Sequence, residues 1–224
     1  MLKLLHHYLD PSSRLIRLIF AEYNIEIELE NASNWKRSDN LEQLDNGAFA
    51  PILLNDKISP LIGPLAIIHH IEDNYQPQNN SLIPKEPKDR AEMWRLYDWI
   101  MSKFNDEITH YILEEKIGKR EQRHGAPDPS ALRAAKLNLK QHEKYFTYLF
   151  ASRTWLGGKD LSLADFALAS HISILDYLGD ITWIENNEMK NWYSAIKSRP
   201  AFRTLLSDKY VGMKVSSHYA DLDF

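Results

Sequence analysis

The hydrophobic and polar positions follow different patterns in the first third of the chain and in the rest. Short apolar or alternating runs, which are typical of strands, occur in the first 75 residues between segments with helical spacing. The expected strands are 2–9, 25–30 and a hairpin over 51–59, and the expected helices are 11–24, a weak one around 41–44, and 65–75. The order β-α-β-α-β-β-α predicts a small α/β domain.

The later part of the chain shows helical periodicity and no convincing strand. Apolar residues follow the i, i+3, i+4, i+7 pattern from Met93 to Ile112, which predicts a long helix with one buried stripe. Further helices are expected over 130–152, from Ser162 onward, over 189–198, and for a turn or two after Pro200. This part therefore predicts an all-helical domain.

These patterns divide the chain into four segments. Three prolines and little apolar content mark a linker before the long helix. We expect an α/β domain over 1–76, this linker over 77–89, a helical domain over 90–209 and an extended tail over 210–224.

Composition narrows the classes of function. The chain has 224 residues and a net charge of −4, which argues against a general nucleic-acid binder. It has no cysteine, so thiolate metal sites and cysteine nucleophiles are excluded. No Gly-rich phosphate loop, HExxH or GxSxG motif is present. Without a signal peptide or a membrane-length apolar run, we expect a cytoplasmic protein with no membrane insertion.

Two local motifs predict structure. Ser162-Leu-Ala-Asp165 is a capping box, in which each side chain bonds the other residue's backbone N–H at a helix start. Ala50-Pro51 stands at the start of a strand. Its peptide bond is either cis, turning the backbone toward a ligand, or an ordinary trans bond before a strand-start proline.

For the histidines and for a cluster of basic residues, we favour structural roles over metal or partner binding. Adjacent histidines, as in His6-His7 and His69-His70, point apart on a strand or a helix and do not chelate, so no metal site is expected. His171 lies in an apolar helix and is expected to be a hydrogen-bonded core residue. Four basic residues form a cluster at the end of the first long helix: Lys116, Lys119, Arg120 and Arg123. We favour an interaction of this cluster with the helix dipole over the docking of an acidic partner.

Several separated motifs together resemble the glutathione transferase superfamily. They are the β-α-β-α-β-β-α unit with Ala50-Pro51, the stretch Gly157-Gly-Lys-Asp-Leu-Ser-Leu-Ala-Asp165, and Ser198-Arg-Pro-Ala-Phe202. The resemblance extends to about residue 207. It implies a thioredoxin-like N-terminal domain, a helical-bundle C-terminal domain, a homodimer, and glutathione lying against the thioredoxin-like domain.

The positions that would hold glutathione depart from the pattern of that superfamily. Asp10 stands before the turn proline, where many members have Ser or Cys, and a carboxylate there would raise the pKa of a neighbouring thiol. Gly63-Pro64 replaces the usual Glu-Ser, so a hydroxyl and a backbone donor are missing. Tyr8 and Ser12 remain as weak catalytic candidates. The resemblance implies a degenerate ligand groove formed by Asp10, Trp35, Ala50, Pro51, Gly63 and Pro64.

A second resemblance concerns the tail. His218-Tyr-Ala-Asp-Leu-Asp-Phe224, together with Leu9-Asp-Pro-Ser-Ser-Arg14 and Trp35-Lys-Arg37, resembles transferase-like alphaproteobacterial division proteins that bind FtsZ. This implies a non-enzymatic protein without a cofactor that bundles or curves FtsZ filaments. The partner-binding residues would be Trp35, Tyr219, Asp221, Leu222, Asp223 and Phe224.

Other interpretations stay open at this point. One is a working glutathione transferase, in which Tyr8 or Ser12 orients the thiol and Pro51 presents the Ala50 backbone to the tripeptide. Another is a binding or chaperone-like protein for a different anionic peptide. For the tail, the alternative to partner binding is packing against its own helical domain.

Overall fold

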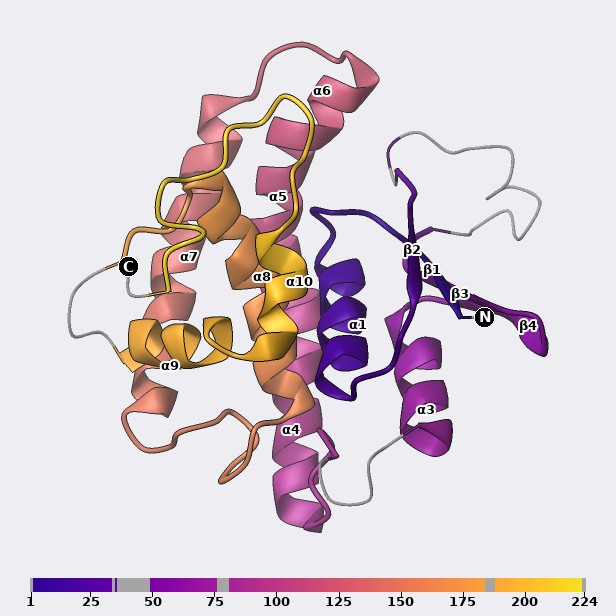
Figure 1. The fold of residues 1–224 in the computed structure, drawn as a ribbon. Coiled ribbons are helices and arrows are strands. Elements are labelled where there is room, and N and C mark those ends of the chain that lie inside the picture. Colours follow the sequence, from indigo (N-terminus) through magenta and orange to yellow (C-terminus); the bar gives the residue numbers. More distant parts are fainter. Residues whose placement is uncertain (1, 34, 36–48, 76–80, 184–187, 223–224) are drawn as a thin grey trace. The chain divides into compact units, whose positions relative to one another are not determined.

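In the computed structural model, the described residues are 2–33, 35, 49–75, 81–183 and 188–222 (Figure 1). The weak helix expected around 41–44 lies outside them. The chain divides into two compact units. One consists of Met1–Ser81 with Pro200–Val211, and the other of Leu82–Arg199 with Gly212–Phe224.

The first unit is built on a mixed four-stranded sheet with the order β2-β1-β3-β4. β1 pairs in parallel with β2 and antiparallel with β3, and β3 pairs antiparallel with β4. The elements are β1 (Lys3–His6), α1 (Pro11–Glu22), β2 (Glu28–Asn31), β3 (Ile52–Asn55), β4 (Ile58–Ile62) and α3 (Pro64–Asn74). The expected strands, hairpin and two flanking helices are therefore present.

The edge strand β2 differs from its expected position. It begins at Glu28 and not at Ile25, and all four of its residues are exposed. The acidic side chains hold it in place, because the Lys3 ammonium lies 3.1 Å from Glu28 and 3.2 Å from Glu30 on the neighbouring strand.

Residues 200–211 complete the first unit. The short helices η3 (Pro200–Phe202) and α10 (Arg203–Leu206) pack against α1. Ala201, Phe202 and Leu205 are buried there. The α/β unit thus includes a late segment of the chain that the sequence pattern assigned to the helical domain.

The second unit is helical in its described residues. Its first helical run begins at Pro87, within the expected linker, because proline is well suited to the first turn of a helix. The run comprises α4 (Pro87–Trp99), η1 (Ile100–Thr109), α5 (His110–Leu113), η2 (Glu114–Gly118) and α6 (Lys119–Gln122). The segments η1 and η2 are π-helical, which the apolar spacing did not predict.

Three further helices are described in this unit. They are α7 (Pro129–Phe150), α8 (Leu163–Leu178) and α9 (Glu188–Lys197). α8 is buried at every position from Leu163 to Tyr177 and packs against α4 and η1. A helix that is buried all round forms the centre of a bundle, and the C-terminal segment after Gly212 folds into turns beside it.

Candidate functional site

The strand register of the first unit brings the predicted ligand positions to one end of the sheet. Leu5 of β1 pairs with Ile52 of β3, and Ile52 pairs with Ile62 of β4. The turn after β1, the residues before β3 and the residues after β4 therefore lie at the same end. β2 runs parallel to β1 and leaves the sheet at that end too. The rings of Trp35 and His7 lie there, 5.1 Å apart.

Asp10 caps a helix at this end. Its Oδ2 accepts a hydrogen bond from the Ser13 N–H at 2.6 Å, and Pro11 follows in the first turn of α1. Burial raises the pKa of the Asp10 carboxyl, and the hydrogen bonds from Ser13 act against that shift. Asp10 stands where the resemblance to the superfamily places the residue that activates the thiol, and here it serves as a helix cap.

The hydroxyls of the turn also serve the turn itself, or have no partner. Ser13 and not Ser12 is buried, and its Oγ accepts from the His7 N–H at 3.1 Å. The carbonyl oxygen of Tyr8 accepts from Arg14 Nε at 2.7 Å. Within the described part of the chain, neither the Tyr8 nor the Ser12 hydroxyl has a hydrogen-bond partner.

The Ala50-Pro51 peptide bond is cis. Ala50 is buried, and the Pro51 carbonyl accepts from the Gly63 N–H at 3.0 Å. Gly63 has a φ of 85° and precedes α3 without a side-chain cap, and Pro64 takes the first helical position. The start of α3 therefore has neither the hydroxyl nor the residue-64 N–H that would hold a carboxylate.

A buried ionic cluster lies behind the turn, and the sequence patterns did not predict it. Arg17 donates to both oxygens of Asp208, at 2.9 and 2.8 Å, and Arg14 Nη2 lies 3.5 Å from the same carboxylate. All three side chains are buried. The sequence signal for this cluster is the presence of two arginines on the otherwise apolar face of the helix over 11–24. Their acidic partner is remote in sequence.

This cluster influences a neighbouring histidine. Burial, and then the charge of Arg17, lowers the pKa of His6 to about 3. His6 is therefore neutral at physiological pH. The Tyr8 ring packs edge-on against it, with 5.0 Å between the ring centroids.

Comparison with known proteins places the fold and the family. No family model matches the chain. FtsZ-localized protein A of Caulobacter vibrioides (strain NA1000 / CB15N) is 38% identical over 224 residues, covering 98% of this chain and 97% of that protein. The chain belongs to the family of FtsZ-localized protein A.

Solved structures agree with this assignment. FzlA from C. crescentus superposes with a TM-score of 0.94 at 37% identity, covering 100% of this chain and 99% of that one. A glutathione S-transferase from Sinorhizobium meliloti 1021 also gives 0.94 at 37% identity, with 100% of both chains covered. The expected order of a thioredoxin-like domain and a helical domain is thus confirmed, and the family of FtsZ-localized protein A has the glutathione transferase fold.

The tail of this family member is partly buried. Tyr219 is only 1% exposed, and its ring lies 5.1 Å from that of Tyr177 in α8. In this structure Tyr219 thus belongs to the core of its own unit, as in the alternative in which the tail packs against its helical domain, and an aromatic ring gains much from such packing. Asp221 and Leu222 are exposed, and Asp223 and Phe224 lie outside the described residues.

The tail residue Tyr219 covers a buried ion pair. Lys197 Nζ lies 3.1 Å from Asp176 Oδ2 and donates to the His218 carbonyl at 2.9 Å. It also faces the Tyr219 ring at 5.7 Å from the centroid. The segment around His218 and Tyr219 is thus tied to the helical unit by both charge and packing.

The capping box is present at the start of α8. The Asp165 carboxylate accepts from Ser162 N at 2.9 Å and from Ser162 Oγ at 2.7 Å. It also accepts from Leu156 N at 2.8 Å and from Trp192 Nε1 at 3.0 Å. The box is therefore the centre of a network that also holds the preceding loop.

The basic cluster is paired within its own unit. Lys116 Nζ lies 2.6 Å from Asp180, Lys119 pairs with Glu115, and Arg120 donates to the Gly212 carbonyl. Arg123 ends α6 in the left-handed conformation. These pairings agree with a structural role for the cluster.

The remaining histidines are structural where the contacts are given. His171 is buried, its Nδ1 lies 2.8 Å from Thr109 Oγ1, and burial lowers its pKa to about 3. It is the hydrogen-bonded core residue that was expected. Across the described ranges, no three His, Asp or Glu side chains gather closely enough to hold a metal ion. Nor does any described helix combine the length and the apolarity needed to cross a bilayer.

Proposed function

We propose that this protein is a non-enzymatic cell-division protein that binds FtsZ and bundles or curves its filaments. The observation that carries the proposal is 38% identity over nearly the full length with FtsZ-localized protein A. The proposal places the protein in the cytoplasm, where it acts as a homodimer. Two identical partner sites per dimer would cross-link adjacent filaments and gain avidity without new contacts.

The condition of the glutathione positions supports a role without catalysis. Asp10 is engaged as a helix cap, the Gly63 N–H is bonded to Pro51, and Pro64 has no N–H. The first of these puts a carboxylate where a thiolate would form, which opposes ionisation of that thiol. The other two remove donors for glutathione's γ-glutamyl carboxylate.

The contact residues in this proposal are Trp35 of the first unit and, separately, the tail residues that follow Tyr219 in the second unit. Because Tyr219 is anchored in the core, the described residues that directly follow it start from a defined point on the helical unit. Asp221 and the 40%-exposed Leu222 combine charge with apolar surface, as protein interfaces do.

Co-sedimentation with polymerised FtsZ tests the proposal. We expect the wild type to pellet with FtsZ in GTP and to raise light scattering through bundling. Deletion of 221–224 and the variant Trp35→Ala should each weaken pelleting, and Asp221→Lys should do the same. The control Asp160→Lys reverses the charge of an acid in another loop and should pellet normally. A wild type that stays in the supernatant contradicts the proposal.

A specific observation favours glutathione chemistry as a second candidate. A relative of 37% identity is a glutathione S-transferase. Calorimetry with glutathione and a conjugation assay with 1-chloro-2,4-dinitrobenzene distinguish the two candidates. We expect no micromolar binding and no turnover.

The variant Pro64→Ser tests whether the missing donors at the start of α3 prevent glutathione binding. It returns a hydroxyl and a backbone donor to the start of α3, whereas a Glu at position 63 must also adopt the φ of 85° found there. If the missing donors are the cause, Pro64→Ser should bind glutathione more tightly than the wild type.

A further inference from the structure

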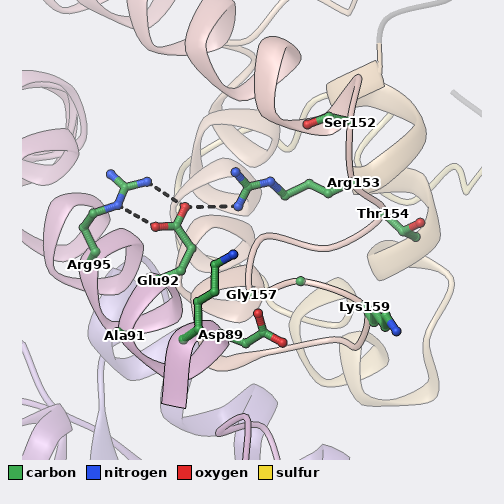
Figure 2. A pocket seen from close by; sticks show the side chains of 11 residues that line it. Asp89, Ala91, Glu92, Arg95, Ser152, Arg153, Thr154, Gly157 and Lys159 are labelled. Atoms are coloured by element: carbon green, nitrogen blue, oxygen red, sulfur yellow. Dashed lines mark hydrogen bonds and ion pairs between the residues drawn. The ribbon is translucent and has the colours of Figure 1, made fainter. Parts of the chain in front are cut away.

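A cavity of about 850 Å³ with several charged lining residues lies within the helical unit, between the first turns of α4 and the loop of residues 152–159 (Figure 2). None of the described residues discussed for FtsZ or glutathione lines it. Cationic and acidic side chains dominate its wall: Lys88, Arg95, Arg153, Lys159, Asp89 and Glu92.

A carboxylate joins the two arginines. Glu92 lies between them in Figure 2, and Arg95 donates to it through Nε at 2.7 Å and Nη2 at 2.8 Å. Arg153 Nη1 donates to the same group at 3.1 Å. These bonds hold the pKa of Glu92 below its usual range, with the hydrogen bond from Arg95 as the largest cause. Glu92 therefore stays ionised and fixes both guanidinium groups in place.

Several cationic side chains of the wall keep N–H donors that no described protein group accepts. Arg153 Nη1 donates to Glu92 and to the Leu156 carbonyl. Within the described residues, Nε and Nη2 of Arg153 have no acceptor. Lys88 and Lys159 form no hydrogen bond or ion pair with a described residue. Four positive charges thus face two carboxylates, in a chain whose net charge is −4.

The loop that carries Arg153 is held rigidly from behind. The Leu156 N–H bonds the buried Asp165, and the Leu156 carbonyl accepts from Arg153 at 3.0 Å. A Cβ at Gly157 would lie 2.5 Å from Ser162 Oγ, so the loop backbone packs directly on the start of α8. The cationic wall is therefore pre-organised and need not be ordered by a ligand.

We propose that this cavity is a binding site for a small hydrophilic polyanion, namely a phosphate ester or a polycarboxylate. The guanidinium fork matches both groups. The volume exceeds that of a single ion, and Ser152 and Thr154 add hydroxyls. Among the described residues no aromatic side chain lines the wall, which disfavours a flat aromatic ligand.

Titration of the full-length protein tests the site. Pyrophosphate and citrate serve as the phosphate and polycarboxylate probes, in calorimetry and in amide-shift NMR at low salt. We expect one saturable site for at least one probe, with the largest shifts at Gly157 and Gly158. Binding should weaken as salt is added. The probe that binds more tightly identifies the ligand class.

Variants with matched charge changes locate the binding. Lys88→Gln with Lys159→Gln removes two exposed, unpaired cations, so the fold should persist, and affinity should fall at least about tenfold. Arg153→Gln should have a similar effect. The control Lys140→Gln with Lys144→Gln removes two exposed cations of α7 that do not line the cavity, and it should bind like the wild type. Absence of saturable binding, or equal losses in both double variants, overturns the proposal.

Discussion

Two carboxylates cap helices in this molecule, one in each compact unit, and their surroundings differ. Asp10 accepts from the Ser13 backbone at the start of α1 and is partly buried. Asp165 is completely buried and accepts from Ser162, Leu156 and Trp192 at the start of α8. Burial raises the pKa of both groups. The same side chain is thus a replaceable local cap in one unit and the centre of a network in the other.

Removal of the network carboxylate should give the largest effect. Asp165→Ala leaves several buried donors without an acceptor, and unsatisfied buried groups are costly. We expect a loss of about 3 kcal/mol or more in the free energy of unfolding, measured by urea denaturation. The matched variant Ser162→Ala keeps the carboxylate and should cost about 1 kcal/mol. Equal small losses would mean that Asp165 is only a cap.

Loss of the tail anchor Tyr219 should give the next largest loss of stability. Tyr219→Ala removes a buried ring beside Tyr177 and should cost about 3 kcal/mol. Deletion of residues 221–224 keeps that ring and should change stability by less than about 0.5 kcal/mol. Thermal melts of the two variants separate anchoring from partner binding. Early melting of the 221–224 deletion would show that the exposed residues also carry stability.

Acid should destabilise the protein through its buried histidines. His171 and His6 have folded-state pKa values of about 3, against 6.5 when unfolded. The unfolded state therefore binds more protons between pH 3 and 6.5, and stability falls as the pH drops through that window. The raised pKa values of Asp10 and Asp165 act in the opposite direction, so a variant comparison is needed.

His171→Gln isolates one of these groups. Relative to the variant, the wild type should lose up to about 1.4 kcal/mol per pH unit below pH 6. Urea denaturation at pH 7, 6 and 5 measures the difference. A constant difference across this range would mean that His171 has the same pKa in the folded and unfolded states.

The smallest effect is expected at the local cap. Asp10→Ser exchanges one good N-cap residue for another and should change stability by less than about 0.5 kcal/mol. Asp10→Ala, as its control, should cost about 1 kcal/mol. Denaturation curves that show a large loss for Asp10→Ser would place Asp10 in a network like that of Asp165.

Local signals in the sequence predicted the parts of the fold that depend on neighbours in the chain. The spacing of Ile67, Ile68 and Ile71 predicted the buried face of α3, and the Ser162–Asp165 motif predicted the start of α8. The family motifs predicted ligand positions that the strand register brings to one end of the sheet.

Features that depend on distant residues were not predictable in this way. The pairing of Arg17 with Asp208 joins the first helix to a segment near the end of the chain. The burial of Tyr219 depends on Tyr177 and Lys197, which no local pattern relates to it. The cavity beside Glu92 likewise combines two segments about 60 residues apart in the chain.

The partner of Arg17 also has a consequence for the order of events during synthesis. Arg17 and Asp208 are separated by 191 residues, and residues 200–211 complete the α/β unit. At about 5–20 residues per second, the ribosome delivers Asp208 roughly 10 to 40 seconds after Arg17. During that interval two guanidinium groups on the core side of α1 lack their counter-ion. Neither unit can therefore finish folding when residue 199 has been made, because residues 200–211 complete the first unit and residues 212–224 belong to the second.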